Sequence, residues 1–239
     1  ADRRIGEPRL QVIAGQRIDR GHQDGEGDEI RGRDPQAERV HQFHHHHGPE
    51  QERELLTTIL EEADRLNRLV GNLLDLARIR AGALTPTRQP AAMDEIVEVV
   101  LARMRPRLAA HTVTAELPAD LPDVSVDPVQ LDQVLTNLLE NAGRHTPEGR
   151  EIRVSVQWVR DAVQVRVADQ GPGIPADERD RVFEAFYRGS SSPETPGSGL
   201  GLAISKAVVV AHGGRIWIED ADGGGCVVAF EIPGEDGGL

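Results

Sequence analysis

The sequence predicts a two-layer α/β sandwich preceded by one long helix. Residues 152–159 and 163–168 alternate apolar and polar side chains, which is typical of adjacent strands in an antiparallel sheet. A helical pattern over residues 128–143 lies among further short strand patterns. This mixture predicts helices packed on one face of a single antiparallel or mixed sheet. Residues 51–83 carry apolar residues three and four positions apart, which predicts the long helix.

Composition and charge exclude several classes of protein. The net charge of −13 argues against a nucleic-acid or anionic-membrane surface, because such surfaces need clustered lysine and arginine. The single cysteine, Cys226, excludes an internal disulfide and fits a reducing compartment. No apolar run reaches the roughly 18–20 residues of a membrane-spanning helix. We therefore expect a cytoplasmic chain that makes no membrane contact itself, whether or not it is the soluble end of a membrane-anchored sensor.

The first 50 residues differ from the rest of the chain. They are rich in glycine, proline, histidine and scattered charges, without a helical or strand period, so we predict that this stretch is poorly ordered. The run His44–His47 lacks the ligand spacing of a folded metal site.

The helix predicted over residues 51–83 has acidic residues in its early turns, Arg78 and Arg80 in its last turn, and Gly82 as a stop. One interpretation is a core-facing helix within a monomer. We favour the other, which is half of a dimerisation hairpin that builds a four-helix bundle. The seam of that hairpin would be formed by Leu56, Ile59, Ala63, Leu66, Val70, Leu73 and Ala77.

Residues 84–235 are predicted to form the sandwich. Asp127 is placed to cap the helix over residues 128–143, and Pro128 suits its first turn. The other expected elements are a helix over residues 93–108 broken near Pro106, strands at 112–117, 123–126, 215–219 and 226–232, and a helix at 200–211. The domain prediction is therefore an irregular segment 1–50, a hairpin helix 51–83, the sandwich 84–235, and a tail 236–239.

A polar face is predicted on the helix over residues 128–143. Asn137, Glu140, Asn141 and Arg144 lie three or four positions apart and so share one side of the helix. Asparagine oxygens can hold a metal ion, and a guanidinium can hold phosphate. The alternative is a solvated polar face without a ligand.

The segment Asp169-Gln170-Gly171-Pro172-Gly173 follows a predicted strand. The Asp169 carboxylate there could accept a hydrogen bond from an exocyclic amine, while the glycines let the backbone approach a flat ring. Taken alone, this pattern is more often a simple turn.

Two further motifs follow. Phe183-Glu184-Ala185-Phe186-Tyr187-Arg188 gathers aromatic rings that we expect to pack a lid against the domain. Gly197-Ser198-Gly199-Leu200-Gly201-Leu202 opens a helix, where free N–H groups bind phosphate. No strand precedes it and no Lys-Ser/Thr follows, so it is neither a dinucleotide fingerprint nor a Walker loop. Gly223–Gly225 is predicted to be a hairpin turn.

In this order and at these separations, the four segments resemble the N, G1, F and G2 boxes of the histidine-kinase ATP-binding domain. That domain belongs to the GHKL superfamily, together with type II topoisomerases, heat-shock chaperone ATPases and mismatch-repair ATPases. The helix at residues 55–83 resembles the second helix of the kinase dimerisation and histidine-phosphotransfer hairpin. The similarity covers residues 51–233 and is greatest to potassium-responsive sensor kinases.

The resemblance implies a role for each matched residue. Asn141 would bind Mg²⁺, Asn137 would support the phosphates, and Glu140 would act as a general base or polarise the acceptor histidine. The residues implied to bind ATP are Asp169 at the adenine amino group, Gly171 and Gly173 around the base, Arg144 and Arg188 at the phosphates, and Gly197, Gly199, Leu200 and Gly201 at the phosphate-facing end of a lid over residues 184–198.

The activity implied by the resemblance is transfer of the γ-phosphoryl group of ATP to a histidine, for relay to an aspartate on the receiver domain of a response regulator. The implied assembly is a homodimer formed through residues 51–83. An anti-sigma-type serine kinase shares the ATP-binding fold, but the long helix argues against that class.

The sequence departs from the family in one respect. It contains no motif like Ser-His-Glu/Asp-Leu-Arg-Thr-Pro, in which such kinases carry the acceptor histidine. An ATP-binding regulatory module, or a truncated or frame-damaged kinase, is therefore the alternative. A single lysine among 27 basic residues indicates GC-rich coding, and a one-base shift of histidine codons at 44–47 would yield threonines that suit an interhelix loop. Sequencing the coding DNA through codon 50 tests the frame hypothesis.

Overall fold

The computed structural model describes residues 9–13, 49–119, 121–189 and 198–234. These fall into two compact units, residues 49–69 and residues 9–13 with 70–234, so the helix α1 (Pro49–Arg80) contributes to both. The remaining helical elements are α2 (Met93–Met104), α3 (Pro128–His145), the 3-10 turn η1 (Arg181–Phe183) and α4 (Gly201–Ala211). The strands are β1 (Arg9–Ile13), β2 (Gln89–Ala91), β3 (Thr112–Leu117), β4 (Val124–Val126), β5 (Glu151–Val159), β6 (Ala162–Asp169), β7 (Arg215–Asp220) and β8 (Cys226–Pro233).

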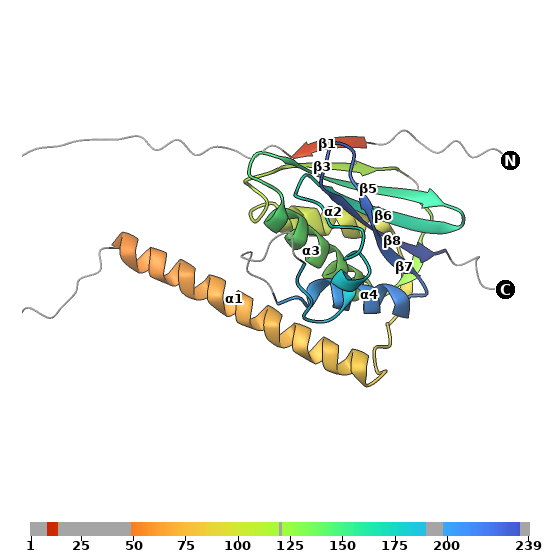
Figure 1. Cartoon of the computed structure of the whole chain (residues 1–239), viewed down its shortest axis with the longest axis horizontal. Helices are drawn as coiled ribbons and strands as arrows, with labels where there is room; N and C mark the ends of the chain where they lie inside the picture. Colours follow the sequence, from red (N-terminus) through yellow and green to blue (C-terminus); the bar gives the residue numbers. More distant parts are fainter. Residues whose placement is uncertain (1–8, 14–48, 120, 190–197, 235–239) are drawn as a thin grey trace, which may run out of the picture. The chain divides into compact units, whose positions relative to one another are not determined.

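The second unit is a two-layer α/β sandwich, as predicted. Its sheet has the strand order β1-β3-β5-β6-β8-β7, and a separate two-stranded sheet pairs β2 with β4. Neighbouring strands are antiparallel except for β3 and β5, which are parallel, so the sheet is mixed. Helices α2, α3 and α4 lie on one side of this sheet (Figure 1).

The core lies between the sheet and these helices. In β5, Ile152, Val154 and Val156 are buried while residues between them are more exposed, which is the predicted alternation. Strand β6 departs from it because Gln164, on the opposite face, is also buried. The amide of Gln157, its cross-strand partner, donates a hydrogen bond to Gln164 Oε1 at 2.6 Å. This pair satisfies a polar group that burial would otherwise penalise.

The predicted start of α3 is confirmed. Asp127 Oδ1 accepts hydrogen bonds from the backbone N–H groups of Val129 at 3.1 Å and Gln130 at 3.2 Å, and Pro128 occupies the first turn. The other carboxylate oxygen of Asp127 accepts from Thr87 N–H at 3.0 Å. The cap therefore also ties α3 to the segment that leads into β2.

The predicted stop of α1 is confirmed as well. Gly82 has φ +65°, and its N–H donates to the carbonyl of Ile79 at 3.0 Å, as expected of a glycine C-cap. The seven seam residues predicted on α1, which run from Leu56 to Ala77, are all exposed in this single chain. Leu76, by contrast, is buried in the core of the second unit.

Several boundaries differ from prediction. Helix α2 ends at Met104 rather than continuing to residue 108. Its C-cap, Arg105, still has a helical backbone (φ −46°, ψ −47°), but the next residue, Pro106, has no N–H group to continue the helical hydrogen bonds. Strand β1 lies inside the segment predicted to be irregular, where it pairs antiparallel with β3. The predictions for residues 1–8, 14–48 and 236–239 lie outside the described residues, and the domain boundaries remain a prediction. Among the described residues, no helix is long and apolar enough to cross a membrane.

Candidate functional site

Asp169 is the last residue of β6 and is buried, with 6% of its surface exposed. Its Oδ1 accepts hydrogen bonds from the backbone N–H groups of Gly171 at 2.8 Å and Cys226 at 3.3 Å. The Cys226 thiol donates to Oδ2 at 3.0 Å. Burial raises the pKa of this thiol, and the neighbouring carboxylate raises it further, so the thiol stays protonated and remains a donor. Three donors thus fix a buried carboxylate that still has acceptor capacity.

Close backbone contacts surround this carboxylate. A Cβ added to Gly171 would lie 2.7 Å from the carbonyl oxygen of His145, at the end of α3. Gly173 has φ +76°, and its Cβ would lie 3.2 Å from the carbonyl oxygen of Gly225. A Cβ on Gly225, in the β7–β8 turn, would come within 2.0 Å of the carbonyl oxygen of Asp169. Glycine is therefore required where the turn after β6 meets α3 and the predicted hairpin turn.

The predicted polar face of α3 is present. Glu140 and Asn141 are half-buried and Arg144 is exposed. Arg144 Nη1 donates to Asn141 Oδ1 at 3.4 Å, and Glu140 Oε1 accepts from Arg107 Nη1 at 3.1 Å. At the end of the helix, burial lowers the pKa of His145, the charge of Arg144 lowers it further, and Asp169 opposes both effects. An amide oxygen beside a guanidinium is a donor set that suits Mg²⁺ and phosphate.

Asn137 connects α3 to the start of α4. Its Nδ2 donates to the carbonyl oxygen of Gly201 at 3.3 Å and to Ser205 Oγ at 3.5 Å. A Cβ on Gly201 would lie 3.6 Å from Asn137, an ordinary contact, so the structure has room for an alanine there. Because α3 touches both the Asp169 turn and α4, the structure brings three of the four motifs together along one helix.

The base of the predicted lid is closed by backbone. Phe186 N–H donates to the carbonyl oxygen of Gly199 at 2.9 Å, and both residues have positive φ values, +66° and +67°. A Cβ on Gly199 would lie 2.8 Å from the carbonyl oxygen of Tyr187. Leu200 is buried at the N-cap of α4, where its N–H donates to Ser198 Oγ at 3.4 Å. The two ends of the lid are thus held against each other.

The prediction for the aromatic rings is only partly right. Phe183 is buried, and Lys206 Nζ lies 5.4 Å from its ring centroid, while Arg181 stacks over Tyr187 at 4.6 Å. Phe186, however, is 57% exposed and does not pack against the domain. Its backbone has a positive φ of +66°, which the spacing of aromatic residues does not reveal.

Arg188 is exposed at the end of the described part of the lid. Residues 190–197 of the predicted lid, which include Gly197, lie outside the described residues. The structure therefore places Arg188 but does not place Gly197.

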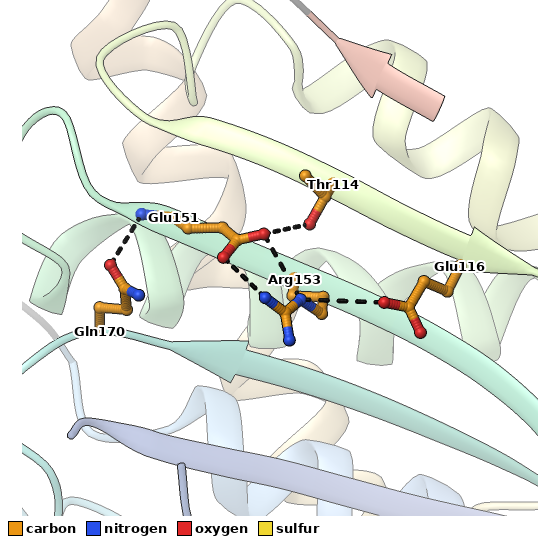
Figure 2. A network of polar contacts seen from close by, with 5 residues as sticks. All are labelled: Thr114, Glu116, Glu151, Arg153 and Gln170. Atoms are coloured by element: carbon orange, nitrogen blue, oxygen red, sulfur yellow. Dashed lines mark hydrogen bonds and ion pairs between the residues drawn. The ribbon is translucent and has the colours of Figure 1, made fainter. Parts of the chain in front are cut away.

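A polar network on the other face of the sheet anchors the Asp169 turn (Figure 2). Gln170 Oε1 accepts a hydrogen bond from the backbone N–H of Glu151 at 3.2 Å. The Glu151 carboxylate in turn accepts from Thr114 Oγ1 at 2.7 Å and from Arg153 Nη2 at 2.8 Å, and Arg153 also lies 3.9 Å from Glu116. The turn is thus held through the strands β3 and β5 as well as through β8.

Two residues of the site were missed by the sequence reasoning. Cys226 was used only to infer the redox compartment, and Arg107 was not considered. Cys226 directly follows the triple glycine at the start of a predicted strand, a position that could have drawn attention to it. Nothing in the local sequence marks Arg107 as a partner of Glu140.

Comparisons with known proteins agree with this geometry. Residues 126–236 match the family model of the histidine kinase-, DNA gyrase B- and HSP90-like ATPase. Residues 38–82 match the model of the His Kinase A (phospho-acceptor) domain. The second match begins ahead of the predicted boundary at residue 51 and includes His41 and His44–His47, which lie outside the described residues.

Individual relatives are also sensor kinases. The chain is 34% identical over 185 residues to the adaptive-response sensory kinase SasA of Synechococcus sp. (strain JA-3-3Ab), covering 76% of this chain and 49% of that protein. It is 38% identical over 179 residues to the signal transduction histidine-protein kinase/phosphatase MprB of Mycolicibacterium paratuberculosis (strain ATCC BAA-968 / K-10), covering 74% of this chain and 34% of that protein. The chain thus spans between a third and a half of the length of these relatives.

Solved structures give the same answer. A structure of the mycobacterial sensor histidine kinase MprB matches with a TM-score of 0.56 and 34% identity, covering 62% of this chain and 98% of that chain. Histidine kinase ThkA in complex with the response regulator protein TrrA matches with a TM-score of 0.60 and 25% identity, covering 78% of this chain and 52% of that chain. The particular similarity to potassium-responsive kinases remains a prediction. With the fold, the two family models and these relatives in agreement, the chain belongs to the sensor histidine kinases, and residues 126–236 are its ATPase domain.

Proposed function

We propose that this chain is the kinase core of a two-component signalling protein, which transfers the γ-phosphoryl group of ATP to a histidine for relay to a response-regulator aspartate. The observation that supports this most is the buried carboxylate of Asp169, oriented by three donors beside the polar face of α3. A fixed acceptor of this kind suits the exocyclic amino group of adenine. Gly171 and Gly173 would shape the base pocket, because the turn that they form packs so closely on the carbonyl oxygens of His145 and Gly225 that it has no room for side chains there.

The phosphate end would lie along α3 towards α4. Arg144 and Arg188 would bind phosphate oxygens, and the N–H groups of the segment 197–201, which includes Gly199, Leu200 and Gly201, would close over them. Asn141 Oδ1 would hold Mg²⁺, and Asn137 would keep α4 in register with α3 through its bond to Gly201. When bound, Mg²⁺ would neutralise phosphate charge.

The transfer itself requires little covalent work from the protein, because it depends mainly on positioning and charge. One imidazole nitrogen of the acceptor attacks the γ-phosphorus. As the N–P bond forms, the bond from phosphorus to the bridging oxygen breaks, and ADP leaves with that electron pair. Glu140 accepts a hydrogen bond from the other ring nitrogen and takes up its proton, so the phosphorylated imidazole is left neutral at that nitrogen.

The proposed acceptor is one of the five histidines in the segment that matches the phospho-acceptor family model. Residues 38–82 contain His41 and His44–His47 and no other histidine. The proposed partners are a second copy of the chain, bound through the exposed seam of α1, and a response-regulator receiver domain. The proposed location is the cytoplasm.

A second candidate follows from the absence of the acceptor motif Ser-His-Glu/Asp-Leu-Arg-Thr-Pro from the sequence. In this alternative, the chain binds ATP as a regulatory module, or is a damaged kinase, and does not phosphorylate itself.

The test is incubation of the purified chain with Mg²⁺ and γ-labelled ATP, followed by chemical analysis of the label. Acid-labile, base-stable label that maps to one of the five histidines supports the kinase. ATP binding without label supports the second candidate. Acid-stable label, or no ATP binding, contradicts both.

A further inference from the structure

Two arginines join the end of α2 to successive turns of α3. Arg103 Nη2 donates to Asp132 Oδ1 at 2.7 Å and to Thr136 Oγ1 at 2.6 Å. One turn further along, Arg107 Nη1 donates to Glu140 Oε1 at 3.1 Å. The three acceptors are four positions apart, so they form one row on α3, and that row ends at Glu140.

The segment that carries Arg107 is itself held firmly. Arg107 follows the end of α2, and its N–H donates to the carbonyl of Met104 at 2.9 Å. The next residue, Leu108, is buried, and a Cβ on Gly143 would lie only 2.6 Å from Leu108 Cδ2. Leu108 therefore packs directly against α3 one turn beyond Glu140. This contact fixes the backbone position from which the side chain of Arg107 extends.

Glu140 needs such a partner for the role proposed above. Its side chain is 19% exposed and lies beside Asn137 and Asn141 on α3. A glutamate has three side-chain torsions, so a carboxylate without a fixed neighbour would visit several orientations. A guanidinium hydrogen bond restricts it to one, and pre-oriented groups are what a positioning-dependent transfer requires.

We propose that Arg107 is the residue that positions Glu140 for phosphoryl transfer. This inference rests on the proposed function. Arg107 does not contact the nucleotide in this account; it acts by holding the Glu140 carboxylate in one orientation through the hydrogen bond from Arg107 Nη1 to Glu140 Oε1. A partly exposed ion pair adds little to stability, so its removal leaves the fold intact.

Arg107→Gln is the test variant, and Arg103→Gln is its matched control, because the same helix pair carries a similar contact one turn away. The rate of label transfer at saturating Mg²⁺ and ATP is expected to fall about tenfold in Arg107→Gln. This loss is smaller than the roughly hundredfold or greater loss expected when a general acid or base is itself removed. ATP affinity, measured by titration calorimetry, is expected to stay within about twofold, and Arg107→Lys is expected to recover part of the rate. Arg103→Gln is expected to change neither quantity.

A double-mutant cycle separates positioning from a structural role. In Glu140→Gln, the further change Arg107→Gln is expected to cause no additional loss of rate, because both act through one carboxylate. The proposal would be overturned if the two rate losses multiplied in the double variant, if the rate of Arg107→Gln were unchanged, or if its ATP affinity fell. None of these outcomes would contradict the kinase assignment. Absence of phosphohistidine in the unmodified chain would overturn both.

Discussion

At the scale of single residues, the site depends on how one carboxylate is held. Asp169 accepts from two backbone N–H groups and from the thiol of Cys226, all in a buried environment. Asp169→Ala is therefore expected to lower stability as well as to abolish ATP binding, because the alanine variant would leave three buried donors without an acceptor, at a cost of about 1–3 kcal/mol each where water cannot replace the carboxylate.

Cys226 offers a cleaner substitution. Cys226→Ala removes the side-chain donor to Asp169 Oδ2 and retains the backbone donor, so ATP affinity is expected to fall about three- to tenfold, which corresponds to about 0.7–1.4 kcal/mol, the net contribution of one ordinary hydrogen bond. Cys226→Ser keeps a donor at the same position and is expected to bind ATP nearly as well as the unmodified chain. Titration calorimetry checks both. Equal weakening in the serine and alanine variants would show that sulfur packing, rather than donation, matters.

At the scale of elements, the N-terminus of α4 and the described start of the predicted lid meet at Gly199, whose carbonyl oxygen accepts a hydrogen bond from Phe186 N–H. Its backbone is left-handed, and an added Cβ would lie 2.8 Å from the carbonyl oxygen of Tyr187, so there is no room for a side chain. Gly201, two residues along, has only ordinary contacts. The two positions of one motif therefore differ: Gly199 has no room for a side chain and Gly201 does. The glycine-rich sequence pattern does not distinguish them.

Gly199→Ala is expected to lower stability by about 1–2 kcal/mol and to weaken ATP binding, because the closed base of the lid must open to accept a Cβ. For a chain of this size, that loss lowers the melting temperature by roughly 2–8 °C. Gly201→Ala is the control and is expected to melt at or above the temperature of the unmodified chain, since alanine favours helix. A lower melting temperature for Gly201→Ala than for Gly199→Ala would contradict the account.

The other end of α4 is joined to α3 by a buried histidine. His212 Nδ1 donates to the carbonyl of Val208 at 2.8 Å, and His212 Nε2 accepts from the backbone N–H of Asp127 at 3.0 Å. This pattern requires the neutral ring. Burial lowers the pKa of His212, with the charge of Arg88 acting in the same direction, while the Val208 carbonyl and Asp127 oppose the shift.

Because the folded pKa lies below the unfolded value of about 6.5, the unfolded chain takes up the proton first as the pH falls. The stabilisation from His212 is therefore complete above about pH 6.5 and is lost as the pH decreases, at up to about 1.4 kcal/mol per pH unit for one proton. Urea unfolding at pH 7.5 and pH 5.5 checks this, with His212→Gln as the comparison because His111 and His145 also have lowered pKa values. An equal pH dependence in both proteins would remove His212 as the cause.

At the scale of the whole molecule, α1 has two different apolar surfaces. Leu76 is buried in the core of the second unit and Ile79 packs against that core, while Asp75 accepts a hydrogen bond from Gln133 Nε2 at 2.6 Å. Leu66 and Leu73, on the predicted seam, are 60% and 53% exposed. A helix that presents such a stripe to water in a single chain is expected to bury it against another helix.

The expected result is a dimer that depends on this seam. Leu73→Glu places a charge in the buried centre of the proposed bundle and is expected to give a monomer at micromolar concentration, with the ATP-binding unit still folded. Thr57→Glu changes an exposed position outside the seam and is expected to leave the dimer intact. Sedimentation equilibrium distinguishes the two. A monomeric unmodified chain would exclude dimerisation through this seam.

Much of this architecture was predictable because its signals are local. The Asp127 cap, the Gly82 stop and the alternation in β5 each lie within a few residues, and the structure confirms all three. Contacts between distant residues were not predictable in the same way. The bond of Cys226 to Asp169 spans 57 residues and that of Arg107 to Glu140 spans 33, so neither follows from helical or strand periodicity. Strand β1 was missed because five residues give too short an alternation among glycines and charges, and its pairing with β3 is long-range.

The most direct test of the central claim is whether Asp169 recognises the amino group of adenine. Titration calorimetry would compare ATP with purine riboside triphosphate, which lacks only that amino group, in the unmodified chain and in Asp169→Asn. The account predicts that the unmodified chain binds ATP about tenfold or more tightly than the analogue, the worth of one buried hydrogen bond to a carboxylate, and that Asp169→Asn loses this preference. Equal affinities of the unmodified chain for the two nucleotides would contradict the placement of the base at Asp169.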